Sequence, residues 1–296
     1  MFSYAAFIIT YKRAGVLSGT IEKILSQTSP PSKILVVDND EERSAEAIIK
    51  NFKGGILDYY NVGYNSGPAG AACIGLKKLF EEGWEWVLWM DDNDPPPFGD
   101  SIQKIFEIPS QYSAPEKIGM IGAVGVKFDS KKAKTIRIAD NKLKGVIEVD
   151  NIAGNMMPII NRRVFQSNIL PDEKLFFGFE ELDFSLAVKR KGLAVLVSGE
   201  ELYRYRENAG RLGLKRSLYK KKKIETLWRE YYSLRNCLYI LKTKERSVLG
   251  VLSISIKAVG KSIAGFKYGF SYGSKNFNYL FSALVDGFSE RMGKRI

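Results

Sequence analysis

The stretch Trp86-Val-Leu-Trp-Met-Asp-Asp-Asn-Asp94 joins an unbroken apolar run to a dense group of carboxylates. Unbroken runs of this length are typical of strands that are buried on both faces of a parallel sheet. Three carboxylates within four residues repel one another unless a cation or basic groups offset their charge. A divalent metal at the end of a buried strand would explain the arrangement. The alternative is a polar loop whose aspartates cap a helix ahead of Pro95.

Apolar runs of the same kind occur at Tyr4–Thr10 and Ile34–Val37, and each ends in polar residues. Between the runs, apolar residues recur at helical spacing over residues 16–25 and 69–80. Alternating strand and helix signals predict an α/β fold with a doubly wound, mostly parallel sheet. A further strand is expected at Gly119–Val126.

The second half of the chain is less regular at first and then becomes helical. We expect basic hairpins or loops over residues 127–149, and a helix that begins near Glu180 and ends at Gly192. Residues 249–266 repeat apolar side chains at helical spacing, so this helix either packs on the catalytic domain or lies on a membrane surface. The expected division is a catalytic domain over residues 1–215 and a basic, helical, membrane-associating region over residues 216–296.

Polar residues follow three of the expected strands. They begin at Thr10, Asp38 and Asp91, and in doubly wound sheets such strand ends meet in one crevice where ligands bind. Asp38 and Asn39 could bind a base or ribose, or simply form a turn. The glycine-bearing loop Asn65–Ala71 enters a helix and offers N–H groups to a phosphate or ribose, although such loops are common.

Composition limits the chemistry that these residues can perform. The 296 residues include no histidine and only two cysteines, which excludes a Ser-His-Asp triad and a histidine-ligated zinc site. A metal site would therefore be built mainly from oxygen ligands, which favour Mg²⁺ or Mn²⁺. The net charge of +12 predicts an anionic partner: nucleic acid, an anionic membrane or a phosphorylated substrate. Much of the positive charge lies in one basic block, formed by Lys215, Arg216, Lys220, Lys221, Lys222 and Lys223.

Targeting signals are weak. The N-terminal segment lacks the basic region and cleavage pattern of a signal peptide, and Ser247–Ile256, the strongest uncharged apolar stretch, is too short to span a bilayer. With so few cysteines, a reducing, cytoplasmic environment is expected.

Together these motifs resemble glycosyltransferase family 2, the inverting nucleotide-sugar transferases with the GT-A fold, and most closely its rhamnosyl- and galactofuranosyl-transferase branch. The similarity runs in order along nearly the whole chain. Its motifs are Phe7–Arg13, Val36–Asn39, Asn65–Gly70, Trp89–Asn93, Phe177–Phe184, Tyr231–Asn236 and Asp286–Gly293.

The resemblance implies a role for each motif. Glu181 would be the catalytic base, with Glu180 and Asp183 around the acceptor. Asp91 would bind the ribose or the metal, and Asp92 with Asn93 would ligate Mn²⁺ or Mg²⁺ on the diphosphate. The nucleotide sugar would be bound by Thr10, Lys12, Arg13, Asp38, Asn39, Asn65, Gly67 and Asp91.

Three positions depart from the family pattern. Asn93 replaces the third aspartate of the metal motif, so Asp94 could contribute instead. Glu181 replaces an aspartate as base. The histidine that several relatives place on the metal is absent, and Glu200, Glu201 or water could fill its position.

The sequence therefore predicts an inverting, metal-dependent enzyme of cell-surface polysaccharide synthesis. It would transfer galactofuranose or rhamnose from a UDP- or dTDP-sugar to a glycan or polyprenyl-linked acceptor, at the cytoplasmic face of the membrane with peripheral contact to anionic lipid. Two alternatives are a nucleotidyltransferase that releases pyrophosphate and a non-enzymatic protein that binds anions or nucleic acid. No nucleic-acid partner is expected, because the crevice is acidic and the basic residues lack interleaved aromatic residues.

Overall fold

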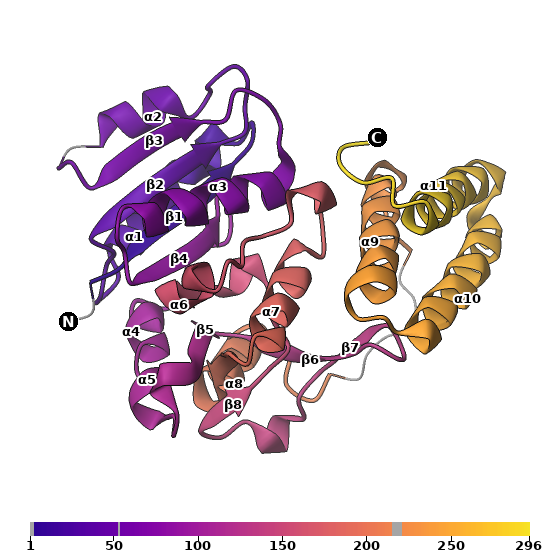
Figure 1. The fold of residues 1–296 in the computed structure, drawn as a ribbon. Coiled ribbons are helices and arrows are strands. Elements are labelled where there is room, and N and C mark those ends of the chain that lie inside the picture. Colours follow the sequence, from indigo (N-terminus) through magenta and orange to yellow (C-terminus); the bar gives the residue numbers. More distant parts are fainter. Residues whose placement is uncertain (1–2, 53, 215–220) are drawn as a thin grey trace. The chain divides into compact units, whose positions relative to one another are not determined.

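The computed structural model describes residues 3–52, 54–214 and 221–296 of the chain (Figure 1). The chain divides into two compact units, each with its own core. This differs from the division expected near residue 215, because two earlier segments, 128–136 and 173–180, belong to the second unit. The remaining ranges are 1–127, 137–172 and 181–213 for the first unit and 214–296 for the second.

An eight-stranded sheet forms the centre of the first unit, with strand order β3-β2-β1-β4-β10-β5-β11-β8. Strands β1 to β4 pair in parallel, β5 pairs in parallel with β11, and β8 and β10 run antiparallel to their neighbours. The expected α/β fold with a mostly parallel sheet is thus confirmed. The strands are β1 (Ala5–Thr10), β2 (Lys33–Asp38), β3 (Leu57–Asn61), β4 (Trp86–Asp91), β5 (Ile118–Gly122), β8 (Val146–Glu148), β10 (Ile159–Asn161) and β11 (Ala194–Ser198).

Helices cover both faces of this sheet because successive strand residues point to opposite sides. Ile8 packs in one core cluster with Leu17 of α1, while its neighbour Phe7 packs in the other with Leu76 of α3. Gly75 lets α3 lie close to β1, since a Cβ there would be 2.6 Å from the Phe7 ring. The helices are α1 (Ala14–Leu25), α2 (Glu46–Asn51), α3 (Gly67–Glu81), α4 (Ser101–Ile105), α5 (Ile108–Gln111), α6 (Arg162–Gln166), α7 (Glu180–Arg190) and α8 (Gly199–Asn208).

The strand expected at Gly119–Val126 is instead two strands, β5 and β6 (Gly125–Asp129). Between them the Ala123 N–H donates to the carbonyl of Met156, which takes the chain away from the ladder of β5. Strand β6 then pairs antiparallel with β9 (Asn151–Ile152). An apolar stretch of sequence looks like one strand even where the chain pairs with a different strand halfway along it. Within the expected loop region the structure also forms β7 (Lys134–Ile136) and β8.

The second unit is mainly helical, as the sequence predicts for the described residues after 221. Helix α9 (Trp228–Tyr239) continues into a π-helical turn at Ile240–Lys244 and is followed by α10 (Val248–Ala264) and α11 (Phe270–Phe288). The small core of this unit includes Phe176, Tyr231, Tyr232, Leu234, Ala258, Leu280 and Ala283. Lys215, Arg216 and Lys220 of the basic block lie outside the described residues.

Helices α10 and α11 leave much apolar surface exposed. With a following 3₁₀ turn, α10 forms a helical segment Val248–Tyr268 that is long and apolar enough to cross a membrane by length and composition alone. The uncharged apolar stretch Ser247–Ile256 is shorter than this helical segment, because the helix continues past Lys257 and Lys261. Side chains at least 40% exposed are Val248, Leu249, Leu252, Ile256, Val259, Ile263 and Phe266 on the first helix, and Phe270, Phe277, Phe281, Val285 and Phe288 on the second.

Candidate active site

Three strand ends of the first unit lie side by side. Parallel pairing places Thr10 of β1 opposite Asp38 of β2, and Ile9 of β1 opposite Asp91 of β4. The polar groups that follow these strands therefore meet at the carboxyl edge of the sheet, where doubly wound folds bind ligands.

Asp92 is held on the inner side of this edge. It is 1% exposed, and its Oδ2 accepts a hydrogen bond of 2.9 Å from the Thr10 hydroxyl. The Arg13 guanidinium lies 3.4 Å from Oδ1, and the Thr20 hydroxyl donates to the Asp92 carbonyl at 2.6 Å. Burial raises the pKa of Asp92, and the Thr10 and Arg13 contacts oppose that shift. Asp92 thus fixes the turn after β4, and metal ligation by its carboxylate stays a prediction.

Asp91 lies in a concentration of negative charge. Burial, followed by the charges of Glu181, Asp94 and Asp92, raises the pKa of Asp91 to about 7. Among the described residues no group of three or more acidic or sulfur side chains is already arranged around one metal position. The oxygen donors nevertheless suit Mn²⁺ or Mg²⁺, because a divalent cation would replace the proton that Asp91 holds near neutral pH.

Asn93 and Asp94 differ in their surroundings. Asn93 is exposed, whereas Asp94 is partly buried and close enough to Asp91 to raise its pKa. Metal ligation by Asn93 or by Asp94 stays a prediction.

Asp38 faces the protein interior. Its Oδ1 accepts the Asp40 N–H at 2.9 Å and its Oδ2 accepts the Tyr59 hydroxyl at 2.8 Å. The side chain is 0% exposed, so in this conformation Asp38 shapes the end of β2. Lys12 is half exposed and lies 4.0 Å from Asp40. Contact of Asp38 or Lys12 with a nucleotide stays a prediction.

Asn39 ties the glycine-bearing loop to the end of β2. Its amide nitrogen donates to the Gly67 carbonyl at 3.1 Å, and its amide oxygen accepts the Ser66 hydroxyl at 2.7 Å. Asn65 Oδ1 accepts the Gly67 N–H at 3.0 Å, and Gly67 has a φ of +71°, which favours glycine. The sequence indicated Asn39 and the loop separately, and the fold brings them together.

Glu181 lies in the first turn of α7. Its Oε1 accepts the Gly154 N–H at 3.1 Å, and burial raises the pKa of its carboxyl. A Cβ on Gly154 would lie 3.1 Å from that oxygen and 3.4 Å from the indole nitrogen of Trp89. A carboxylate with a raised pKa is a better proton acceptor near neutral pH, which suits a general base. In the sequence, Gly154 is only a glycine in a loop to which no function was assigned.

Glu180 and Asp183 are both buried at the start of α7. Glu180 belongs to the second unit, whereas Asp183 belongs to the first together with Glu181. Their predicted place around an acceptor is not tested by these positions.

Glu200 and Glu201 lie in the first turn of helix α8. Glu200 Oε1 accepts the Gly145 N–H at 2.7 Å, and Glu201 Oε1 lies 3.4 Å from the Arg204 guanidinium. These contacts do not direct either carboxylate to the end of β4, so the structure gives no support to their filling the histidine position.

Arg235 and Asn236 are the residues whose function the sequence did not show. Both are 0% exposed, and both donate to the loop Leu175–Gly178, which leads into Glu180 and Glu181. The available signal was the motif Tyr231–Asn236, which carries part of the family resemblance but suggested no role for either side chain.

Comparison with known proteins agrees with this architecture. Residues 5–142 match the family described as glycosyl transferase family 2. The chain is similar to the galactofuranosyltransferase GlfT1 of Mycolicibacterium smegmatis, with 20% identity over 201 residues that cover 64% of this chain and 66% of that protein. GlfT1 of Mycobacterium tuberculosis is 22% identical over 203 residues, with the same coverage. The chain spans about two thirds of the length of these relatives.

Solved structures share the fold. A structure of GalNAc-T7 with UDP, GalNAc and Mn²⁺ has a TM-score of 0.58 and 13% identity, covering 98% of this chain and 56% of that one. The mannosyltransferase PcManGT of Pyrobaculum calidifontis, with GDP-Man and Mn²⁺, has a TM-score of 0.55 and 13% identity, covering 97% and 87%. Residues 5–142 are thus similar to glycosyl transferase family 2, and the chain shares the GT-A-type α/β fold of these solved glycosyltransferases.

Proposed function

We propose that this protein is an inverting, metal-dependent glycosyltransferase that moves a sugar from a UDP- or dTDP-sugar to a hydroxyl of a glycan or polyprenyl-linked acceptor. The observation that carries the proposal is the pairing of an acidic strand end, Asp91 to Asp94, with a buried carboxylate, Glu181, in a domain similar to family 2. The first supplies oxygen ligands and the second supplies a base.

Glu181 would take the proton from the acceptor hydroxyl as that oxygen attacks the anomeric carbon. The Gly154 N–H donates to one oxygen of the Glu181 carboxylate, and the other oxygen would accept the proton. A single in-line displacement inverts the anomeric centre and releases the nucleoside diphosphate.

Asp91 and Asp94, with Asp92 or Asn93, would hold Mn²⁺ or Mg²⁺, and the bound ion stabilises the negative charge of the leaving diphosphate. The N–H groups at the start of α3, positioned by Asn39 and Gly67, are suited to the ribose or phosphates. Thr10 and Arg13 already fix the neighbouring turn, so they would shape the base side of the same site.

The donor proposal rests on the relatives. Both curated relatives are named galactofuranosyltransferases, and the two structural neighbours hold UDP and GDP-Man. UDP-galactofuranose is therefore our first candidate donor, and dTDP-rhamnose is the second.

Thermal unfolding with a panel of nucleotides tests the donor site. UDP or dTDP should raise the Tm only with Mn²⁺ or Mg²⁺, since ligand at about 100 times its Kd stabilises a protein by about 2.7 kcal/mol. The shift should be lost in Asp91→Asn and kept in Glu22→Gln, an exposed carboxylate on α1. A metal-independent shift, or no shift with any nucleotide, would contradict the proposal. Release of pyrophosphate from a nucleoside triphosphate would support the nucleotidyltransferase alternative instead.

We place the reaction at the cytoplasmic face of an anionic membrane. The exposed apolar side chains of α10 and α11 suit insertion into an interface, and the net positive charge suits anionic headgroups. Vesicles with phosphatidylglycerol should bind the protein in a salt-sensitive manner, and Ile256→Asn with Ile263→Asn should weaken binding. Equal binding to neutral vesicles at high salt would contradict an electrostatic, peripheral contact.

A further inference from the structure

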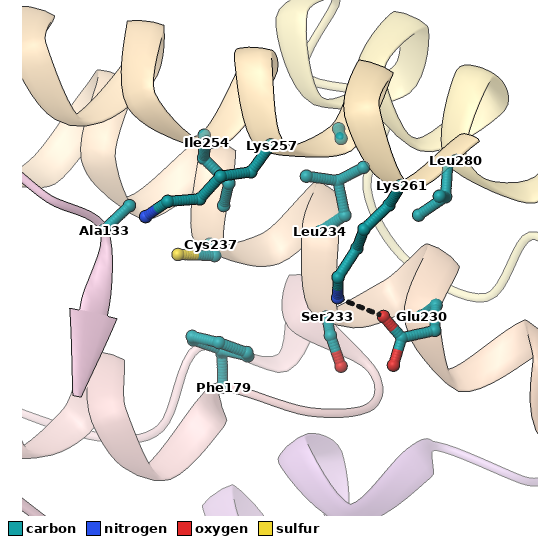
Figure 2. A pocket seen from close by; sticks show the side chains of 11 residues that line it. Ala133, Phe179, Glu230, Ser233, Leu234, Cys237, Ile254, Lys257, Lys261 and Leu280 are labelled. Carbon is teal, nitrogen blue, oxygen red and sulfur yellow. Dashed lines mark hydrogen bonds and ion pairs between the residues drawn. The ribbon is translucent and has the colours of Figure 1, made fainter. Parts of the chain in front are cut away.

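Lys261 and Arg204 each connect separate segments of the chain through ion pairs outside the candidate site. In the second unit, Lys261 of α10 lies 3.1 Å from Glu230 Oε2 of α9, and both side chains line a pocket of about 180 Å³ (Figure 2). In the first unit, Arg204 of α8 lies 2.8 Å from Asp100 Oδ1. Asp100 belongs to the segment that follows the acidic strand end, so this second ion pair bears on the proposed metal site.

The Arg204 guanidinium makes three contacts at once. Its central carbon lies 3.8 Å from the centre of the Phe98 ring, and its Nη1 donates to Asp100 Oδ1 at 2.8 Å and to Glu201 Oε1 at 3.4 Å. A planar guanidinium can stack on a ring and donate hydrogen bonds from its edge, which a lysine ammonium cannot do. Glu201 is 5% exposed, and burial raises the pKa of its carboxyl while Arg204 opposes that shift. Arg204 thus attaches Phe98 and Asp100 to helix α8.

Neighbouring residues hold the same short segment. Gln27, just after α1, donates from Nε2 to the Phe98 carbonyl at 2.9 Å, and the Thr28 N–H donates to the Gly99 carbonyl at 2.8 Å. The Tyr205 ring meets the Phe98 ring edge to face, with 5.6 Å between their centres. The segment is therefore fixed between the end of α1 and helix α8, and Arg204 supplies a charged contact to it.

A run of prolines, Pro95–Pro97, connects this fixed segment to Asp94. Each proline fixes its own φ near −65° and restricts the residue before it to extended conformations. Consecutive prolines therefore form a semi-rigid spacer of about 3.1 Å per residue. Because the spacer is stiff, the position of Asp94 follows that of Phe98. On the other side of Asp94, the Thr20 hydroxyl holds the Asp92 carbonyl at 2.6 Å, so the acidic residues are anchored at both ends.

We propose that Arg204 is a positioning residue for the metal ligands at the end of β4. By holding Phe98 and Asp100, it sets the position of Asp94 relative to Asp91 through the three prolines. The inference rests on the proposed function, which assigns these two carboxylates to Mn²⁺ or Mg²⁺. A guanidinium is positively charged and has no acceptor atom, so Arg204 acts through the loop and not as a ligand.

Metal binding can be measured without the transferase reaction, by calorimetric titration of the full-length protein with Mn²⁺ in the presence of UDP and, in parallel, of dTDP. Arg204→Gln should weaken Mn²⁺ binding about 10-fold, as is typical when a residue that orients metal ligands is removed. Loss of a positive charge would by itself favour a cation, so weaker binding indicates displaced ligands. Arg211→Gln, at an exposed arginine after α8, is the matched control and should bind as the wild type does. Equal affinity in both variants would overturn the inference.

Asp100→Asn removes the same contact from the side of the loop and leaves Arg204 paired with Glu201. Asp100 is partly exposed, so this variant should melt near the wild-type Tm. It should weaken Mn²⁺ binding by a similar factor, and the double variant with Arg204→Gln should be no weaker than Arg204→Gln alone, because both changes break one interaction. If Asp100→Asn binds as the wild type does, or if the two effects multiply, Arg204 does not act through the loop and the inference fails.

Amide hydrogen exchange reports on the loop itself. In the metal-free protein, the N–H groups of residues 98–101 should exchange at least 10-fold faster in Arg204→Gln than in the wild type or in Arg211→Gln, because the segment opens more often. Weaker Mn²⁺ binding with unchanged exchange would show that Arg204 does not hold the loop, and would overturn the inference. A wild-type protein that binds no Mn²⁺ with either nucleotide would refute the proposed function and this inference together, whereas wild-type binding that survives in the variants would refute the inference alone.

Discussion

Replacing Asn236 with leucine removes the side chain that holds the segment before the proposed base. Asn236 Nδ2 donates to the carbonyl oxygens of Leu175 at 2.9 Å, Phe177 at 3.0 Å and Gly178 at 2.7 Å. Its amide oxygen accepts the Arg235 Nε–H at 3.0 Å. One buried amide therefore supports nearly the whole loop.

The loop needs that support because of its backbone conformation. Phe176, Gly178 and Phe179 have φ values of +60°, +78° and +72°. Left-handed conformations of bulky residues cost about 1–3 kcal/mol each and persist only where surrounding contacts fix them. Without the amide the two phenylalanines are free to relax, which would displace Glu180 and Glu181.

The energetic cost can be worked from these contacts. An unsatisfied buried carbonyl costs about 1–3 kcal/mol, and leucine leaves at least two of the three without their donor. We therefore expect Asn236→Leu to destabilise the protein by roughly 2–5 kcal/mol. For a chain of this size that lowers the Tm by roughly 5–15 °C.

Steady-state kinetics can distinguish a displaced catalytic base from a general loss of stability. At a temperature where the variant remains folded, kcat should fall at least 10-fold while the donor KM stays within about twofold, because the proposed donor residues belong to the first unit. Asn236→Asp, which has the same shape but turns an oxygen toward the carbonyls, should lose at least as much. Asn278→Leu, at an exposed asparagine of α11, is the control.

Wild-type kcat and Tm in both Asn236 variants would refute this reasoning. A fall in Tm with unchanged kcat would show that the loop is structural only. The same measurements on Arg235→Met would report on the second donor, which is 0% exposed and reaches the Leu175 and Gly293 carbonyls.

Three further outcomes are expected for the first unit. Because the pKa of Asp91 is raised to about 7, protons compete with the metal, so Mn²⁺ affinity should rise as pH increases from about 5.5 to 8. Calorimetric titration at several pH values checks this, and Asp91→Asn should flatten the dependence. The metal-free protein should correspondingly lose stability as pH rises through about 7, since its folded state binds the Asp91 proton more tightly than the unfolded chain does. Gly154→Ala should lower kcat about 10-fold with a Tm change of only a few degrees, because its Cβ would crowd Glu181 and Trp89; unchanged kcat would separate Gly154 from the proposed base.

The sequence by itself determined the α/β architecture and the places where strands end. Tyr4–Thr10 and Trp86–Met90 are local apolar runs, and their burial on both faces follows from that composition, so β1 and β4 could be predicted without knowing their partners. The polar residues at these strand ends were visible for the same reason. Parallel pairing then brings strand ends of one direction to one edge.

Only the tertiary structure shows which polar side chains make hydrogen bonds within the protein. Asp38, for example, accepts hydrogen bonds from Tyr59 and from the Asp40 N–H, contacts that the sequence did not indicate. Asn236 reaches Leu175, which is 61 positions away in the chain. The spacing of apolar residues predicts which face of a helix or strand is buried. It does not predict which residue a buried polar group contacts, because that partner is often far away in the sequence. The segments 128–136 and 173–180 join the second unit through such contacts, and no local pattern reveals them.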